Sequence, residues 1–537
     1  MWGSEAVALG LSHSGIGLVS THDSVKAAEI AAALHALPVG ERPAVEVHLS
    51  PARAVESAIA AASVGEGAAV VLPSRAFAPG ASPLHAVAER GTSSALVIVL
   101  IEDPGCEMTP AEIDSRYLAR ELYMPILEPS SLGEALSLCR EAPALSEAWG
   151  QPVMVRLVVR LLDTRGLLEI SPPPAVKRAR GRGAAPELAP MALGAYGGEA
   201  ATHARVRRLD AVSAAVENLL YNRAELTPPS DLLIVAVGAA YTATRDALVL
   251  IGMESTVQLV KVATPFPLPR NLLASAMRKA KRVLVVEELE PYVETRLSEI
   301  ANKEGLRTQV RGKVFIPRGG ELTPWDVADG LGRFAGISPP VDEKRVETIE
   351  RVVREVLPRR APSLPASHAM RTAIEAAESF ARSRKGAAVV VEAPPEWRVA
   401  LEGVAALYFG DWGEGLGVGC ALARRAKGFV VVVTEGRGVV SGLSALREAQ
   451  AERLPLMAVV SPQGLSADVE RALPGAHHHG LDLRALAAAL GLGTDAIVHA
   501  GETDRAGLEA AMASASSGAK GPRILTFGPP APQPGGA

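Results

Sequence analysis

One stretch of the chain, residues 96–136, constrains the fold more than any other. It opens with Leu96–Ile101, a continuous apolar run of the kind that a strand covered on both faces requires. Asp103-Pro104-Gly105 then interrupts the run with loop-forming residues. The stretch therefore predicts a buried parallel strand that ends in a loop.

The residues after this loop predict a helix and a second strand. Thr109-Pro110-Ala111-Glu112 combines a cap, a proline at the first helical position and an acid in the first turn, so we expect a helix over about residues 111–122. Met124–Leu127 follows as a short strand, and residues 128–131 open another helix. This order is typical of a parallel α/β sheet, in which ligands bind at the carboxyl ends of the strands.

Composition narrows the class of protein. At roughly 150 residues per domain, 537 residues predict three or four domains. A net charge of −4 gives no basic footprint for nucleic acid, and we expect no nucleic-acid partner. No apolar run reaches the length of a membrane span, and the first residues lack the basic region of a signal peptide. We therefore expect a cytoplasmic protein that does not cross a membrane.

The rest of the chain repeats the α/β pattern. The expected strands are Ile16–Ser20, Glu46–Leu49, Ala68–Leu72, Val153–Val158, Asp231–Gly238, Val257–Val262, Arg282–Glu288, Ala387–Val391, Phe429–Val433, Met457–Val460 and Ile524–Phe527. We expect α/β domains at residues 1–170, 226–340 and 365–530, a linker with a connecting helix at 171–225, a charged helix with a linker at 341–364, and a disordered tail at 531–537.

Several motifs resemble one family. Glu112-x-Asp114-x-Arg116-Tyr117 follows the first loop, and Leu127-Glu128-Pro129-Ser130 follows the next strand. Further along come Pro265-x-Pro267-Leu268-Pro269, Val285-Val286-Glu287-Glu288 and Gly320-Glu321-Leu322-Thr323-Pro324. In this order the motifs resemble the alpha subunit of indolepyruvate:ferredoxin oxidoreductase, a thiamine diphosphate enzyme of the 2-oxoacid:ferredoxin oxidoreductase superfamily.

The resemblance implies a role for each domain. Residues 1–170 would be the pyrimidine-binding domain, residues 226–340 a transketolase C-terminal-like domain, and residues 365–530 the diphosphate-binding domain. It also implies thiamine diphosphate and Mg²⁺ as cofactors. The implied assembly is a homodimer, or a hetero-oligomer with a beta subunit or a catalytic alpha paralogue.

The chain departs from the family at the expected catalytic carboxylate. The family's glutamate, which hydrogen-bonds the aminopyrimidine ring, corresponds to Pro51, and proline has neither an acid nor an N–H. Glu46 and Glu56 lie nearby in sequence, and we interpret both as surface or structural residues. The family's turn rich in glycine and proline corresponds to Thr21–Ala27, which contains neither residue.

The expected diphosphate and metal site also departs from the family's pattern. Val433–Gly438 stands where the family has its metal-binding turn, and Glu435 is the candidate metal ligand because divalent cations prefer oxygen ligands. The family's second ligand, an asparagine, is missing from Val460–Gly464. A tight turn also explains the two glycines of this segment. The candidate cofactor-binding residues are Glu435, Gly436, Arg437, Gly438, Asp103 and Gly105.

Electron carriers are missing from the sequence. The three cysteines, Cys106, Cys139 and Cys420, are dispersed without ligand spacing. The family's two-cysteine motif corresponds to Pro365–Met370, which has no cysteine, and a cubane cluster takes four thiolates. We expect no iron–sulfur cluster in this chain.

Four further features have both a structural and a functional interpretation. Consecutive His477–His479 lack the i,i+4 spacing of a helical metal site, so we favour a polar loop. Gly413–Gly419 is favoured as a packed helix over a phosphate loop, and Cys106 as a plain thiol. Asp114 and Arg116 either pair at the domain surface or line the old cofactor cleft.

Loss of motifs at four separate places favours a catalytically degenerate alpha-type subunit with a structural or regulatory role. A second hypothesis is a working enzyme that decarboxylates aryl 2-oxoacids such as indolepyruvate to acyl-CoA, with ferredoxin as acceptor and clusters on a partner. A third is a ligand-binding sensor that keeps part of the cleft.

Overall fold

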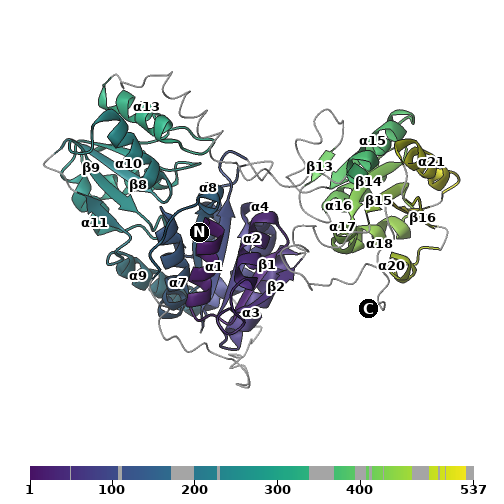
Figure 1. The fold of residues 1–537 in the computed structure, drawn as a ribbon, viewed down its shortest axis with the longest axis horizontal. Helices are drawn as coiled ribbons and strands as arrows, with labels where there is room; N and C mark the ends of the chain where they lie inside the picture. The colour runs from purple at the N-terminus through teal and green to yellow at the C-terminus, as the bar shows by residue number, and fades with distance from the viewer. Residues whose placement is uncertain are drawn as a thin grey trace. The chain divides into compact units, whose positions relative to one another are not determined.

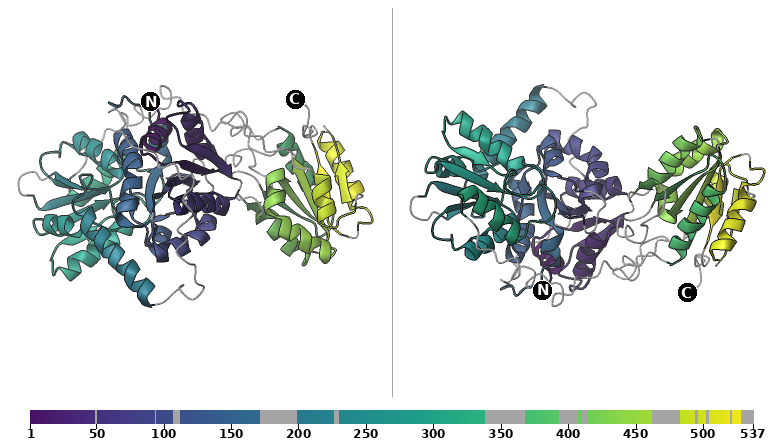
Figure 2. Two further views of the ribbon diagram at one scale, coloured as in Figure 1. Left: turned by 90° about the horizontal axis from the view of Figure 1, so that it is seen from below. Right: turned by 90° about the horizontal axis from the view of Figure 1, so that it is seen from above.

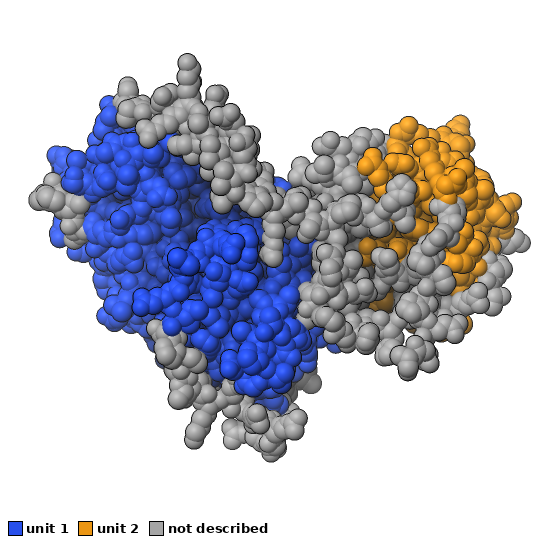
Figure 3. Space-filling model, viewed as in Figure 1, with its two compact units in different colours: residues 1–106, 111–361 blue, residues 107–110, 362–537 orange. Residues whose placement is uncertain are grey.

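The computed structural model describes residues 1–48, 50–92, 94–106, 112–170, 199–225, 230–337, 368–392, 407–409, 414–426, 428–461, 483–493, 496–501, 504–519 and 521–527. The chain divides into two compact units, which Figure 3 colours separately: Met1–Cys106 with Ala111–Ala361, and Glu107–Pro110 with Pro362–Ala537. Within these described residues, the first unit contains two β-sheets and the second contains one (Figures 1 and 2). The predicted α/β class with three parallel sheets is therefore confirmed, apart from one antiparallel edge strand.

The first sheet of unit 1 has six parallel strands in the order β2-β1-β3-β4-β6-β5. Helices α3, α4 and α5 cover one face, where alternate residues of β3 and β4 form the core. Helices α1, α2 and α7 pack together against the sheet as well, so the central strands are buried along their length. The strands are β1 (Leu18–His22), β2 (Ala44–His48), β3 (Ala68–Pro73), β4 (Leu96–Glu102), β5 (Ile126–Leu127) and β6 (Val153–Val158). The helices are α1 (Gly3–His13), α2 (Val25–His35), α3 (Pro51–Ser63), α4 (Ser74–Gly80), α5 (Ser82–Arg90), α6 (Arg116–Glu121), α7 (Leu132–Trp149), α8 (Val159–Asp163) and α9 (Glu199–Val216).

The second sheet of unit 1 has the order β11-β10-β8-β9-β7, and only β7 runs antiparallel to its neighbour. Helices α11 and α12 pack on one face, and α10 and α13 pack on the other. The strands are β7 (Arg223–Glu225), β8 (Leu232–Val237), β9 (Gln258–Val262), β10 (Arg282–Val286) and β11 (Gln309–Arg311). The helices are α10 (Ala240–Ile251), α11 (Arg270–Met277), α12 (Tyr292–Lys303) and α13 (Pro324–Ala335).

The sheet of unit 2 has six parallel strands in the order β13-β12-β14-β15-β17-β16. Alternate side chains of β12, β14 and β15 face α15 and α21 on one side, and α16, α18 and α20 on the other. The strands are β12 (Ala388–Glu392), β13 (Leu407–Phe409), β14 (Val430–Glu435), β15 (Leu456–Ser461), β16 (Ile497–His499) and β17 (Arg523–Thr526). The helices are α15 (His368–Arg382), α16 (Glu414–Ala423), α17 (Gly436–Ser441), α18 (Leu443–Ala451), α20 (Leu483–Ala489) and α21 (Arg505–Ser516).

The helix predicted over residues 111–122 is wrong in its first part. Helix α6 begins only at Arg116, and residues 112–115 are not helical. Acidic side chains hold this segment instead, because Glu112 accepts hydrogen bonds from the backbone N–H groups of Gly105 (2.7 Å) and Gly320 (2.6 Å). The N–H of Ser115 donates to Glu102 (2.8 Å) in the same way.

Several predicted features fall outside the described residues. They include the Thr109–Ala111 helix start, the charged helix within residues 341–364, the histidine run 477–479 and the tail 531–537. Among the helices of the described ranges, none combines the length and the apolar character that a membrane crossing requires.

Candidate functional site

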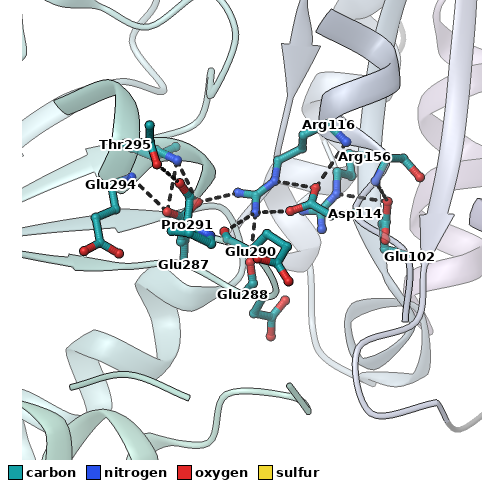
Figure 4. Close-up of polar contacts among 12 residues, drawn as sticks. Glu102, Asp114, Arg116, Arg156, Glu287, Glu288, Glu290, Pro291, Glu294 and Thr295 are labelled. Atoms are coloured by element: carbon teal, nitrogen blue, oxygen red, sulfur yellow. Dashed lines mark hydrogen bonds and ion pairs between the residues drawn. The ribbon is translucent and has the colours of Figure 1, made fainter. Parts of the chain in front are cut away.

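The carboxyl ends of the strands were the predicted place for a site, and in unit 1 they carry a buried network of charged side chains (Figure 4). Arg116 lies at its centre, fully buried at the start of α6. Its guanidinium forms two hydrogen bonds to Asp114, at 2.8 and 2.6 Å. Of the two interpretations of these residues, the surface ion pair is right about the pairing and wrong about the location, because both side chains are almost completely buried. The alternative, that they line the old cofactor cleft, stays a prediction.

The same guanidinium reaches the second sheet. It donates to the Glu287 carboxylate at 2.7 Å and to the backbone oxygens of Glu288 (2.9 Å) and Glu290 (3.0 Å). Its face lies over the ring of Tyr292, 5.1 Å from the centroid. Arg116 therefore ties α6 of the first sheet to the loop after β10 of the second sheet.

Glu287 has a second role at the start of α12. Its carboxylate accepts the backbone N–H groups of Val293 (3.0 Å) and Glu294 (2.9 Å), which have no partner within the helix. Burial raises the pKa of Glu287 above its ordinary value, although the charge of Arg116 opposes this shift. The carboxylate thus depends on Arg116 to remain charged in a buried place.

Two more arginines extend the network. Arg156, on β6, donates to Glu128 at 3.0 Å and lies 3.4 Å from Glu102. Burial raises the pKa of Glu102, and the charge of Arg156 opposes this. Arg160, on α8, donates to Glu288 at 2.9 Å. These carboxylates are committed to ion pairs within unit 1, so the network is suited to joining two sheets.

Lys313 completes this region from the loop after β11. Its ammonium group donates to the backbone oxygens of Glu287 (2.5 Å) and Pro317 (2.9 Å). Burial lowers the pKa of Lys313 to about 8, and the charge of Glu287 offsets only part of the effect. The group titrates within the neutral to alkaline range.

Asp103 and Gly105, two predicted cofactor-binding residues, lie in the loop after β4. Asp103 is buried, and its backbone oxygen accepts the N–H of Cys106 at 3.2 Å. Gly105 has a φ of +89°, a backbone conformation that favours glycine. The turn itself therefore explains this glycine.

The expected pyrimidine site of the first sheet contains no buried acid at the predicted position. Pro51 is the first residue of α3. Glu46 is half exposed and contacts Ser57 and His48, whereas Glu56 pairs with Arg53 at the surface. At the end of β1, the buried hydroxyls of Ser20 and Thr21 have no hydrogen-bond partner among the described residues, a feature that the sequence pattern did not reveal.

In unit 2 the carboxyl ends of β12 and β14 carry Glu392 and Glu435, and both are buried. Glu392 contacts the first turns of two helices. A Cβ atom placed on Gly415 of α16 would lie 2.8 Å from the Glu392 Oε2 atom, and one placed on Gly438 of α17 would overlap Glu392 and Thr434. The Glu392 carboxylate therefore occupies the space beside the predicted diphosphate turn, where the two helix dipoles favour an anion.

The other predicted residues of this turn have clear positions. Glu435 is the N-cap residue of α17, and Gly436 is the first residue of that helix. The side chain of Arg437 is outside the described structure. The close contacts of Gly415 with Glu392, and of Gly419 with Val432, fit the predicted packing role of this glycine-rich helix. No group of three histidine, cysteine, aspartate or glutamate side chains in the described ranges is placed to hold a metal ion.

The cysteines differ in environment. Cys139 and Cys420 are buried, whereas Cys106 is partly exposed. Burial raises the pKa of the Cys139 thiol to about 12, so it remains protonated at neutral pH.

Curated proteins that resemble this chain in sequence carry the same name. No protein-family model matches the chain. The chain is 26% identical over 367 residues to indolepyruvate oxidoreductase subunit IorA of Pyrococcus abyssi, and the match covers 67% of this chain and 56% of that protein. It is 28% identical over 367 residues to the subunit of the same name from Methanothermobacter marburgensis, covering 67% and 57%. The chain thus spans little more than half the length of these relatives.

A solved structure, the 2-oxoglutarate:ferredoxin oxidoreductase from Magnetococcus marinus, matches with a TM-score of 0.49 and 16% identity. The match covers 62% of this chain and 64% of that chain.

Proposed function

Because this chain is a homologue of the indolepyruvate oxidoreductase subunit IorA, we propose that it is an alpha-type subunit that has lost thiamine chemistry and acts as a structural or regulatory subunit. In this proposal the residue ranges 1–170, 226–340 and 365–530 correspond to the pyrimidine-binding, transketolase C-terminal-like and diphosphate-binding domains. The protein works in the cytoplasm, as part of a homodimer or with a beta subunit or a catalytic alpha paralogue.

The observation that carries the proposal is the position of Glu392. A diphosphate needs backbone N–H groups and positive charge, which helix starts supply. At the starts of α16 and α17 the chain places its own buried carboxylate, in contact with the two helices that would receive the ligand. Two anions in one place repel each other strongly where water is excluded. A charged Glu392 in this place would oppose the binding of a diphosphate, which supports the proposed loss of thiamine chemistry.

The expected pyrimidine site supports the same conclusion. Pro51 supplies no acid, and neither Glu46 nor Glu56 is a buried carboxylate free of other contacts. Arg116, in contrast, keeps both of its ion pairs, with Asp114 and with Glu287. A subunit that serves assembly needs the ion pairs of Arg116, which join two sheets, but it does not need a catalytic acid at the pyrimidine site.

The test is an activity and assembly assay on the full chain. The chain is purified alone and with the beta subunit of an IorA-type enzyme, and supplied with an aryl 2-oxoacid, coenzyme A, thiamine diphosphate, Mg²⁺ and an artificial electron acceptor. We expect no turnover, together with co-elution of the two chains in size-exclusion chromatography. The Pyrococcus abyssi IorA subunit with its own beta subunit is the positive control. Turnover by this chain above the background of the beta subunit would overturn the proposal.

The end of β1 favours a second candidate, a sensor that binds a small polar ligand. Thr21, next to the last residue of β1, has a buried hydroxyl without a partner among the described residues. Unpaired buried hydroxyls cost free energy unless a ligand or water satisfies them. A thermal-shift screen of nucleotides and 2-oxoacids tests this. A ligand whose effect disappears in Thr21→Val would support the sensor, and a flat screen would remove it.

A further inference from the structure

Unit 1 contains a pocket that lies apart from the expected thiamine sites. Its volume is about 590 Å³, within the range of roughly 300–1,000 Å³ that small-molecule sites occupy. The start of α7, helix α8 and the residues after it form one side. Helix α10, Leu322 and Pro324, the first residue of α13, form the other. Both sides belong to the same compact unit.

The walls of the pocket are apolar. Leu132, Leu161 and Leu322 line it and are themselves almost completely buried, so they form fixed walls. Leu167 also lines the pocket, and its side chain is fully exposed. An apolar ligand body would remove mainly the exposed surface of Leu167 from water, because the other three leucines expose little, and such burial gains about 25 cal/mol per Å².

The polar side chains of the lining are already engaged, with one exception. Arg160 donates to Glu288 and to the Leu322 backbone oxygen (2.8 Å), and Thr242 donates to the Ser130 backbone oxygen (2.6 Å). Within the described part of the chain, Asp246 of α10 is the one charged side chain of the lining that has no hydrogen bond or ion pair. The pocket therefore offers apolar walls and one free negative charge.

We propose that this pocket binds a small organic amine, a molecule with an aromatic or branched aliphatic body and one protonated amino group. The body contacts Leu132, Leu161 and Leu322, and the ammonium group pairs with Asp246 at the opening. Arg160 does not attract a carboxylate ligand, because Glu288 already neutralises it. The proposal holds whether or not the chain binds thiamine diphosphate.

The test uses three ligands of similar shape and different charge: 4-phenylbutylamine, 4-phenylbutanol and 4-phenylbutanoate. Each is titrated into the full chain by calorimetry. We expect the amine to bind about three- to five-fold more tightly than the alcohol, which is the gain of one exposed ion pair, and the carboxylate to bind most weakly. Equal affinity for amine and alcohol, tighter binding of the carboxylate, or no binding of any of the three would overturn the proposal.

Two variants locate the site. Asp246→Asn should reduce amine affinity to that of the alcohol, whereas Asp231→Asn, an exposed aspartate outside the pocket, should leave it unchanged. Gly133→Phe should abolish binding of the amine and of the alcohol. A Cβ atom on Gly133 fits without a clash, because its nearest neighbour is 3.8 Å away, and the phenyl ring would then occupy the pocket. Gly417→Phe, on a helix of unit 2 with no atom within 4 Å of the new Cβ, is the matched control. Amine binding that survives Gly133→Phe would contradict the assignment.

Discussion

Two groups of strand ends in this molecule differ in what surrounds their buried acidic side chains. At the ends of β4 and β10 in unit 1, Arg116 joins Asp114 and Glu287 in complementary ion pairs. At the ends of β12 and β14 in unit 2, the carboxylate of Glu392 lies against two helix starts, next to the turn where the family resemblance places a diphosphate. The first arrangement pairs both carboxylates with one arginine of the same chain and joins two sheets. The second places a buried carboxyl group of the chain itself beside the turn where a diphosphate is expected.

The difference indicates which constraints still act on the sequence. A buried ion pair is costly to break, because the partner that remains is an uncompensated charge. Folding therefore constrains the residues of such a network, whatever the activity of the chain. A cofactor site is constrained by catalysis, and under the proposed function Pro51 and Glu392 mark the places where that constraint has been lifted.

The largest expected effect is at Arg116. Arg116→Met leaves Asp114 and Glu287 buried without their cation, so we expect a loss of about 3–5 kcal/mol in the unfolding free energy of unit 1. Urea unfolding, with hydrogen exchange of α7 and α12 peptides to identify the unit, measures this. Arg333→Met is the control, because its pair with Asp329 is exposed and should contribute under about 1 kcal/mol. Equal effects in the two variants would contradict the structural role of the network.

The next effect is at Gly415. Gly415→Ala brings a Cβ atom to 2.8 Å from the Glu392 carboxylate, so we expect unit 2 to lose about 1–3 kcal/mol. In a Glu392→Ala background the loss should shrink by at least about 0.5 kcal/mol, since two of the three closest atoms are gone. Gly417→Ala on the same helix has free space and should stabilise the unit by roughly 0.5–1 kcal/mol. Additive losses would mean that Glu392 does not occupy the space beside α16.

A smaller effect is expected from the titration of Lys313. Its pKa in the folded protein is about 8, below the ordinary 10.5, so between these values the unfolded state binds more protons. Stability attributable to Lys313 should therefore rise with pH from about 8 to about 10.5, by roughly 1 kcal/mol after solvent screening. Lys313→Met should remove this rise, whereas Lys281→Met, at an exposed pair, should retain it. If the unfolding free energy of Lys313→Met rose with pH as steeply as that of the unchanged protein, the rise could not be attributed to Lys313.

The smallest effect is expected for Glu56. Because it pairs with Arg53 at the surface, Glu56→Gln should change the unfolding free energy by less than about 0.5 kcal/mol. It should also leave any residual 2-oxoacid turnover unchanged. A measurable turnover that disappears in this variant would identify Glu56 as a substitute for the acid lost at Pro51.

Local sequence signals predicted the elements well where packing agreed with them. The apolar run Val153–Val158 is β6 with the predicted bounds, and Ser131 caps α7 through its side chain, as the segment 128–131 indicated. The signal at Thr109–Glu112 failed in the described part, because Glu112 bonds to backbone groups of Gly105 and Gly320. Short edge strands such as β7 and β13 carry too few residues for a pattern.

The site was less predictable because its contacts are not local. Arg116 and Glu287 are 171 positions apart, and no spacing rule connects them. Glu392 lies at the end of a predicted strand, yet its contact with Gly415 and Gly438 depends on how two helices begin above the sheet. The sequence did contain one signal for this site: an acidic residue, Glu392, follows a run of valines. An acid at the end of a buried parallel strand needs a partner, so its position indicated a polar contact there.

The most direct test of the central claim is calorimetric titration of thiamine diphosphate with Mg²⁺ into the full chain, with the Pyrococcus abyssi IorA subunit as positive control. The proposed loss of thiamine chemistry predicts no detectable binding, in agreement with Pro51 and with the Glu392 carboxylate beside α16 and α17. Saturable binding tighter than about 10 μM, roughly −7 kcal/mol, would contradict the account and would show that the chain still accommodates the cofactor.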